Sequence, residues 1–203
     1  MNGKEEVWEI VEKFRQETLR ESSQDLPVDV FTLAEITLRL DVAPFNDLFS
    51  KHCIDAAIML DFSGIYVDAE AYILWERGPV WKQKRLRFSV AHELGHFALH
   101  QEIASKLKFN SLEEFRQWTR TNNGQKYSLE QAANEFAGRL LVPLDRLSSF
   151  FDGFAARFDK EFPEWHANDG MRRMFSASAS DKFGVNADVI EIRLDRESLW
   201  PAE

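Results

Sequence analysis

Residues 85–100 read RLRFSVAHELGHFALH, and this stretch decides the rest of the interpretation. Its apolar residues recur at helical spacing, which predicts a helix with one buried stripe. That stripe consists of Leu86, Val90, Leu94 and Phe97. His92 and His96 are four residues apart, so a helix places them one turn apart on the same face.

The centre of this stretch, residues 92–96, is a His-Glu-x-x-His motif. Two neutral imidazoles one turn apart reach a single metal ion, and zinc is the usual occupant. Glu93 lies at the same edge of the helix, where its carboxylate can take a proton from water at the metal. So short a pattern also arises by chance, but its position inside an amphipathic helix favours metal binding. The motif therefore predicts a zinc peptidase, with His92 and His96 as ligands and Glu93 as the catalytic base.

A catalytic zinc needs a third protein ligand, which a later helix supplies in this interpretation. A third histidine ten residues after His92 is absent, because Glu102 stands there. We predict Glu130 as the ligand, since Asn134 lies one turn further and its carbonyl can accept the ring N–H of a ligand histidine. Glu135 is the competing carboxylate, but it lies about 100° from Asn134 around the helix. Manganese or another divalent ion would also suit such a set.

Two further side chains are candidates for stabilising the transition state. Tyr127 and His166 each carry a hydrogen-bond donor that could face a developing oxyanion. His100, one turn after His96, is expected to support the site or the core and not to bind the metal.

The whole chain predicts an α+β fold with a small, mostly antiparallel sheet on the active-site helix. Strands are expected at residues 57–60, 65–67 and 71–75, where short apolar runs alternate with turn-like intervals. Turn residues are expected at 122–124, a helix opened by Ser128 and stopped by Pro143 follows, and residues 163–170 read as a loop. The remaining helices are expected at residues 5–20, 32–40, 111–121, 144–158, 171–183 and 188–194.

Composition narrows the class of protein. With 203 residues the chain is long enough for one domain with a proper core. We expect an N-terminal helix over residues 1–27, a metallopeptidase core over 28–160 and a helical C-terminal segment of the same domain over 161–203. The single cysteine, the polar N-terminus and the lack of a long apolar run predict a cytoplasmic protein with no membrane contact.

The net charge of -9 argues against a broad nucleic-acid surface, because affinity for phosphates comes largely from Lys and Arg. Residues 32–44 and the segment around Phe183-Gly184-Val185 each resemble part of a helix-turn-helix. The acidic balance makes direct DNA binding the poorer interpretation, although an acidic enzyme suits a basic partner.

Two long motifs in this order resemble the ImmA/IrrE metallo-endopeptidases of bacteria and their mobile elements. The first is RFSVAHELGH at residues 87–96, with His100 beyond it. The second is EQAANEFA at 130–137, running into LLVP at 140–143. The looser pattern spans residues 28–195. One departure is visible: Ala132 stands where many members carry a second Glu, which leaves Glu130 as the acidic residue before Ala133.

The resemblance implies a thermolysin-like zincin core and peptide hydrolysis. It also implies a partner, a helix-turn-helix repressor or antitoxin-like protein that is cleaved to relieve repression under stress or during mobile-element transfer. An alternative from another class is a zinc-bearing module that sequesters such a partner without hydrolysing it. The presence of Glu93 argues against this alternative, because a site that performs no hydrolysis has no need of the base.

Overall fold

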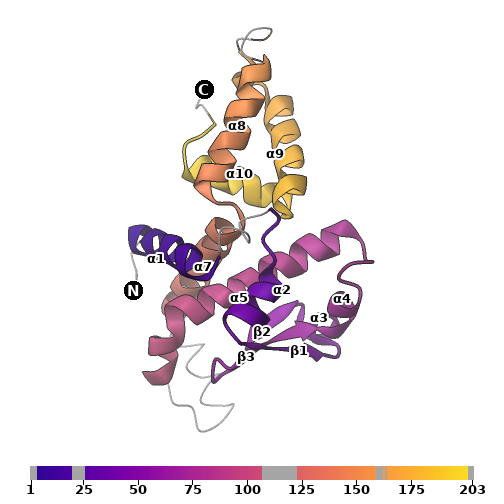
Figure 1. Ribbon diagram of the computed structural model, residues 1–203, viewed down its shortest axis with the longest axis vertical. Helices are drawn as coiled ribbons and strands as arrows, with labels where there is room; N and C mark the ends of the chain where they lie inside the picture. The colour runs from indigo at the N-terminus through magenta and orange to yellow at the C-terminus, as the bar shows by residue number, and fades with distance from the viewer. Residues whose placement is uncertain (1–3, 20–25, 107–122, 159–161, 163, 201–203) are drawn as a thin grey trace.

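Helix α5 (Val80–Lys106) is the long element around which the other parts of the computed structural model pack (Figure 1). The structure describes residues 4–19, 26–106, 123–158, 162 and 164–200, and for residues 4, 103–106 and 123–127 the backbone alone. Leu86, Val90 and Leu94 are fully buried and Phe97 is partly buried against the same core, so the predicted apolar stripe is confirmed. Each such side chain contributes about 1.5–3 kcal/mol through removal from water.

Helix α7 (Asn123–Leu141) lies against α5 at very short range. Gly95 permits this approach, because a Cβ atom there would lie 3.1 Å from both the Cα of Ala133 and the Cβ of Phe136. Ala133 and Phe136 are themselves fully buried. The second sequence motif is therefore packed directly on the first.

The sheet has three strands in the order β1-β3-β2. Strand β1 (Asp41–Phe45) runs parallel to β3 (Gly64–Asp68), and β2 (Ala56–Ile58) runs antiparallel to it. The sheet is thus mixed, and the prediction of a mostly antiparallel sheet is wrong for β1, which was not expected to be a strand. Parallel pairing needs a crossover, which α3 (Leu48–His52) and β2 supply.

The segment expected as a third strand, residues 71–75, is not a strand: residues 71–73 are helical and residues 74–75 form a turn. Helix α4 (Ala69–Ile73) begins directly after β3, and the Asp68 carboxylate accepts a hydrogen bond from the backbone N–H of Ala71 at 3.0 Å. This N-terminal cap satisfies a helix donor that a strand would have paired differently. Apolar content alone misled the prediction here.

Other boundaries also differ from the expectations. Helix α7 starts at Asn123, so the turn predicted at residues 122–124 is wrong for residues 123 and 124, and the predicted helix start at Ser128 is wrong. The loop expected at 163–170 contains a 3₁₀ turn, η3 (Trp165–Ala167), and the first residues of α9. The helix expected at 32–40 is α2 (Val30–Thr32) continued by a π-helical turn, η2 (Leu33–Thr37). The helix expected at 111–121 lies outside the described residues.

The remaining helices build two further parts. Helix α1 (Lys4–Thr18) packs on α7, whereas the last three helices form a lobe above α5 in Figure 1. That lobe consists of α8 (Leu144–Phe158), α9 (Asp169–Phe183) and α10 (Ala187–Arg196). An aromatic cluster that includes Phe154, Trp165 and Phe175 fills its interior. Within the described part of the chain, none of the helices is long and apolar enough to cross a membrane.

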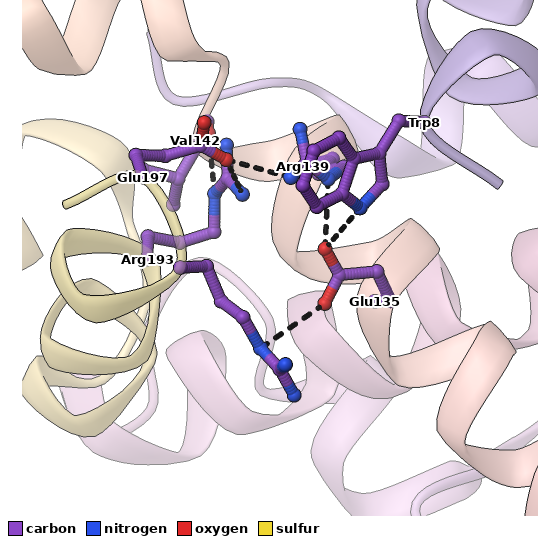
Figure 2. A network of polar contacts seen from close by, with 7 residues as sticks. Trp8, Glu135, Arg139, Val142, Arg193 and Glu197 are labelled. Carbon is purple, nitrogen blue, oxygen red and sulfur yellow. Dashed lines mark hydrogen bonds and ion pairs between the residues drawn. The ribbon is translucent and has the colours of Figure 1, made fainter. Parts of the chain in front are cut away.

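A buried network of charged side chains joins α1, α7 and α10 (Figure 2). Glu135 Oε1 accepts hydrogen bonds from Trp8 Nε1 and Arg139 Nε, each at 2.8 Å. Glu197 Oε1 accepts from Arg139 Nη2 and Arg193 Nη1, each at 2.6 Å. The Arg139, Arg193 and Glu197 side chains are all less than a tenth exposed. Removal of one partner would therefore leave an uncompensated charge in the interior.

We predict that Glu197→Ala lowers the free energy of unfolding by roughly 3–5 kcal/mol, the usual cost of breaking a buried ion pair. It would leave the Arg139 and Arg193 guanidinium groups close together and without their shared carboxylate. Urea unfolding of the metal-free protein measures the effect. Asp195→Ala is the matched control, because Asp195 forms an exposed pair with Arg172 and should cost less than about 1 kcal/mol. Equal losses in the two variants would contradict the assignment.

Candidate metal centre

The two histidines of the motif lie on one face of α5 with their rings together. His92 Nε2 and His96 Nε2 are 3.1 Å apart. The two side chains are 15% and 16% exposed, so both rings are largely buried. The two Nε2 atoms are close enough together to bind one ion.

Glu130 reaches the same point from α7. Its Oε2 lies 3.2 Å from His92 Nε2, and its Oε1 lies 3.9 Å from His96 Nε2. One ligand atom from each of the three residues falls within 4.8 Å of the other two. Across the described ranges, this is the single cluster of at least three His, Cys, Asp or Glu side chains arranged in this way. Close packing at Gly95 brings the two helices near enough for this meeting.

Asn134 gives His92 a defined role in the cluster. Its Oδ1 lies 2.9 Å from His92 Nδ1, and since the amide oxygen only accepts, Nδ1 carries the proton. Nε2, which faces His96 and Glu130, is then the nitrogen that can bind a metal ion when the ring is neutral. Two imidazole nitrogens and a carboxylate that converge in this way are the donor set that zinc prefers. The residues present therefore fit a zinc ion.

Glu93 is buried beside this group, with only 8% of its surface exposed. Its Oε2 accepts a hydrogen bond from the backbone N–H of Ile58 at 2.7 Å. The backbone N–H of the next residue, Met59, donates to Gly64 O at the end of the β2–β3 pairing. Successive N–H groups of a strand point to opposite sides, so the Ile58 N–H points away from β3. Burial raises the pKa of Glu93, although His92 and His96 oppose this shift. A carboxyl group with a raised pKa is a better proton acceptor than an ordinary glutamate.

The charged groups of this cluster change the pKa values of Glu130 and His92. A hydrogen bond with His92, followed by the nearby His96, holds the pKa of Glu130 well below its usual range. Burial lowers the pKa of His92, but contact with Glu130 and the charge of Glu93 more than offset this and leave it raised. Glu130 is therefore ionised at neutral pH and available as an anionic ligand.

Glu135, the competing carboxylate, does not lie in this group. It is directed into the network of Figure 2, where Trp8 and Arg139 donate to it and Arg196 Nε lies 3.7 Å from its Oε2. The 100° rotation between neighbouring helix positions separates it from Asn134 as expected.

The structure describes the side chain of one candidate oxyanion donor, His166, but not that of the other, Tyr127. The backbone of Tyr127 is in α7 just before Glu130, but its side chain lies outside the described part of the chain. His166 belongs to η3, where its ring packs on Trp165 and its carbonyl accepts from Trp200 Nε1. The structure does not bring His166 into the group formed by the predicted ligands.

His100 lies one turn beyond His96 and is only 6% exposed. Its Nδ1 is 2.9 Å from His96 Nδ1, on the side of that ring away from His92. Burial, followed by the nearby His96, lowers the pKa of His100 to about 4. The imidazole is therefore neutral at physiological pH.

Sequence reasoning missed the Ile58 backbone donor. Ile58 is 35 residues from Glu93 in the sequence. Every residue except proline has a backbone N–H, so the residue type does not indicate which N–H binds Glu93. For His100 the spacing of four residues from His96 was visible, and the contact follows from that spacing.

A His-Glu-x-x-His helix joined by a glutamate from a following helix defines a site of the metallopeptidase class. The family comparison agrees: the model of the IrrE N-terminal-like domain, Peptidase M78, matches residues 82–195, which is more than half of the chain. The chain belongs to this family, and the resemblance to the ImmA/IrrE peptidases is confirmed. A search among curated proteins found no match.

Proposed function

We propose that this protein is a zinc-dependent endopeptidase with a thermolysin-like core that cleaves a helix-turn-helix repressor or antitoxin-like protein. One observation carries the proposal: His92 Nε2, His96 Nε2 and the Glu130 carboxylate converge within 4.8 Å, directly beside the buried Glu93. Three protein ligands with a neighbouring carboxylate are what hydrolysis needs, since a structural zinc site would have four protein ligands.

In this proposal His92, His96 and Glu130 hold the ion. When bound, zinc supplies Lewis acidity, which makes water more acidic and a peptide carbonyl more electrophilic. Asn134 accepts the Nδ1 proton of His92 at 2.9 Å and so keeps the metal-binding nitrogen of this ring unprotonated.

Glu93 moves the proton. The Ile58 N–H fixes Oε2, so the carboxylate is oriented before substrate arrives. The carboxylate takes a proton from the attacking water and then gives it to the nitrogen of the leaving amine. Its raised pKa suits both steps, because the group holds the proton more firmly than an exposed glutamate and still releases it to an amine.

The partner follows from the family resemblance. ImmA/IrrE peptidases act with a helix-turn-helix repressor, and the net charge of -9 suits a partner whose DNA-binding surface is basic. The same charge favours action on the repressor over direct contact with DNA.

The test is cleavage of the helix-turn-helix protein encoded beside this gene. We expect discrete fragments by mass spectrometry with the zinc-loaded enzyme, no cleavage after chelation, and recovery on adding zinc back. An unrelated protein of similar size, incubated in parallel, controls for contaminating proteases. Zinc binding without cleavage would favour the sequestering module over the peptidase. A purified protein that takes up no metal would contradict both.

A further inference from the structure

We infer that His100 is a positioning residue that accepts the Nδ1 proton of His96 and so orients this ring for the metal. The inference rests on the proposed zinc site. In this inference the ring N–H of His96 is accepted by an imidazole nitrogen, whereas that of His92 is accepted by the amide oxygen of Asn134.

The geometry of the three histidines supports the assignment. His92, His96 and His100 are spaced by four residues on α5, and their rings follow one another with centroids 4.8 and 4.9 Å apart. His96 uses both nitrogens: Nε2 faces His92 at 3.1 Å, and Nδ1 faces His100 Nδ1 at 2.9 Å. Nε2 is therefore on the side of the metal ligands, and Nδ1 is the nitrogen available for a hydrogen bond that orients the ring.

The tautomer that binds a metal determines which of His96 and His100 donates in this hydrogen bond. A neutral imidazole that binds a metal through Nε2 carries its proton on Nδ1. His96 Nδ1 must then donate, and His100 Nδ1 must accept, which places the proton of His100 on its own Nε2. The 2.9 Å separation allows one proton between the two nitrogens and no more.

His100 does not itself complete the metal site. The cluster of converging ligand atoms contains His92, His96 and Glu130 but not His100, whose near nitrogen is directed at the far side of His96. Its side chain is also buried, which suits a supporting partner in a dry environment.

The consequence is an asymmetric pair of supports. His92 has an amide oxygen from α7, so its orientation depends on how α5 and α7 pack. His96 has an acceptor on its own helix, so this hydrogen bond does not depend on how α5 and α7 pack. Outer partners of this kind change metal affinity about 10- to 100-fold when removed.

The test compares zinc affinities of the full-length protein by competition with a chromophoric chelator. We expect His100→Leu, which fills the space but accepts no hydrogen bond, to weaken zinc binding about 10- to 100-fold. His100→Asn should stay close to wild type, because its Oδ1 provides an acceptor near the place of the imidazole Nδ1. Equal thermal stability of the metal-free variants would confirm that the leucine variant is folded.

A second measurement observes the hydrogen bond directly. In zinc-loaded protein labelled with ¹⁵N-histidine, a scalar coupling across the hydrogen bond should connect the Nδ1 nuclei of His96 and His100. Its absence in wild type would overturn the inference, as would a leucine variant with wild-type affinity or an asparagine variant as weak as leucine. Failure of the wild-type protein to bind zinc would instead refute the proposed metal site.

Discussion

Replacement of Glu93 by glutamine is expected to abolish peptide hydrolysis while zinc remains bound. Glutamine has nearly the same shape, and its amide oxygen can still accept the Ile58 N–H that now donates at 2.7 Å. It cannot take a proton from water, so the rate should fall by about 10²–10⁴-fold, the range for loss of a general base. The measurements are kcat on the cleaved partner and zinc content per protein molecule.

Glu9→Gln makes the same chemical change at an exposed position of α1 and should leave both quantities unaltered. If Glu93→Gln kept full activity, another group would have to be the base and the mechanism proposed for Glu93 would be wrong. Loss of zinc from this variant would mean that Glu93 supports the metal and not the proton transfer.

Replacement of Glu130 by alanine is expected to have the largest effect on the metal. It removes the only anionic member of the group and leaves two neutral imidazoles, so the zinc affinity should fall by more than the roughly 10- to 100-fold typical of outer partners. Hydrolysis should be lost with the metal. Equilibrium competition with a chelator, followed by zinc content after dialysis, gives the ranking.

Gln131→Ala is the matched control, since Gln131 is the next residue of α7 and is exposed. Its zinc affinity should equal that of wild type. Glu135→Ala is a poorer control, because it would break the contacts of Glu135 with Trp8 and Arg139 and destabilise the fold. A Glu130→Ala protein that retained zinc at full stoichiometry would show that another residue is the third ligand.

Much of the candidate site could be predicted because its residues are tied to helical spacing. Four-residue intervals place His92 beside His96 and Glu130 beside Asn134, whatever the rest of the chain does. The meeting of the two pairs was a prediction from chemistry, and the small residues Gly95 and Ala133 are what allow it. The distances between the side chains of α5 and those of α7 could not be predicted from the sequence.

The sheet was harder to predict because its pairing depends on residues far apart in the chain. Strand β1 contains Pro44, which weakens a strand signal and suits an edge position. Residues 71–75 have the apolar content of a strand, but the Asp68 cap decides for a helix. Pairing with the distant β3 therefore decides the structure of β1, whereas a local cap decides that of α4.

Glu93 and the network of Figure 2 bear on how small a working fragment can be. The family match covers residues 82–195 and includes every proposed ligand and the base. Ile58, which orients Glu93, lies before that span, as does Trp8, whereas Glu197 lies after it. A protein trimmed to the matched span would keep the reacting groups but lose the donor that aims the base and the counter-charge of two buried arginines. The unit recognised by sequence comparison is therefore smaller than the unit that must fold, and expression of this enzyme should begin before α1 and continue past Glu197.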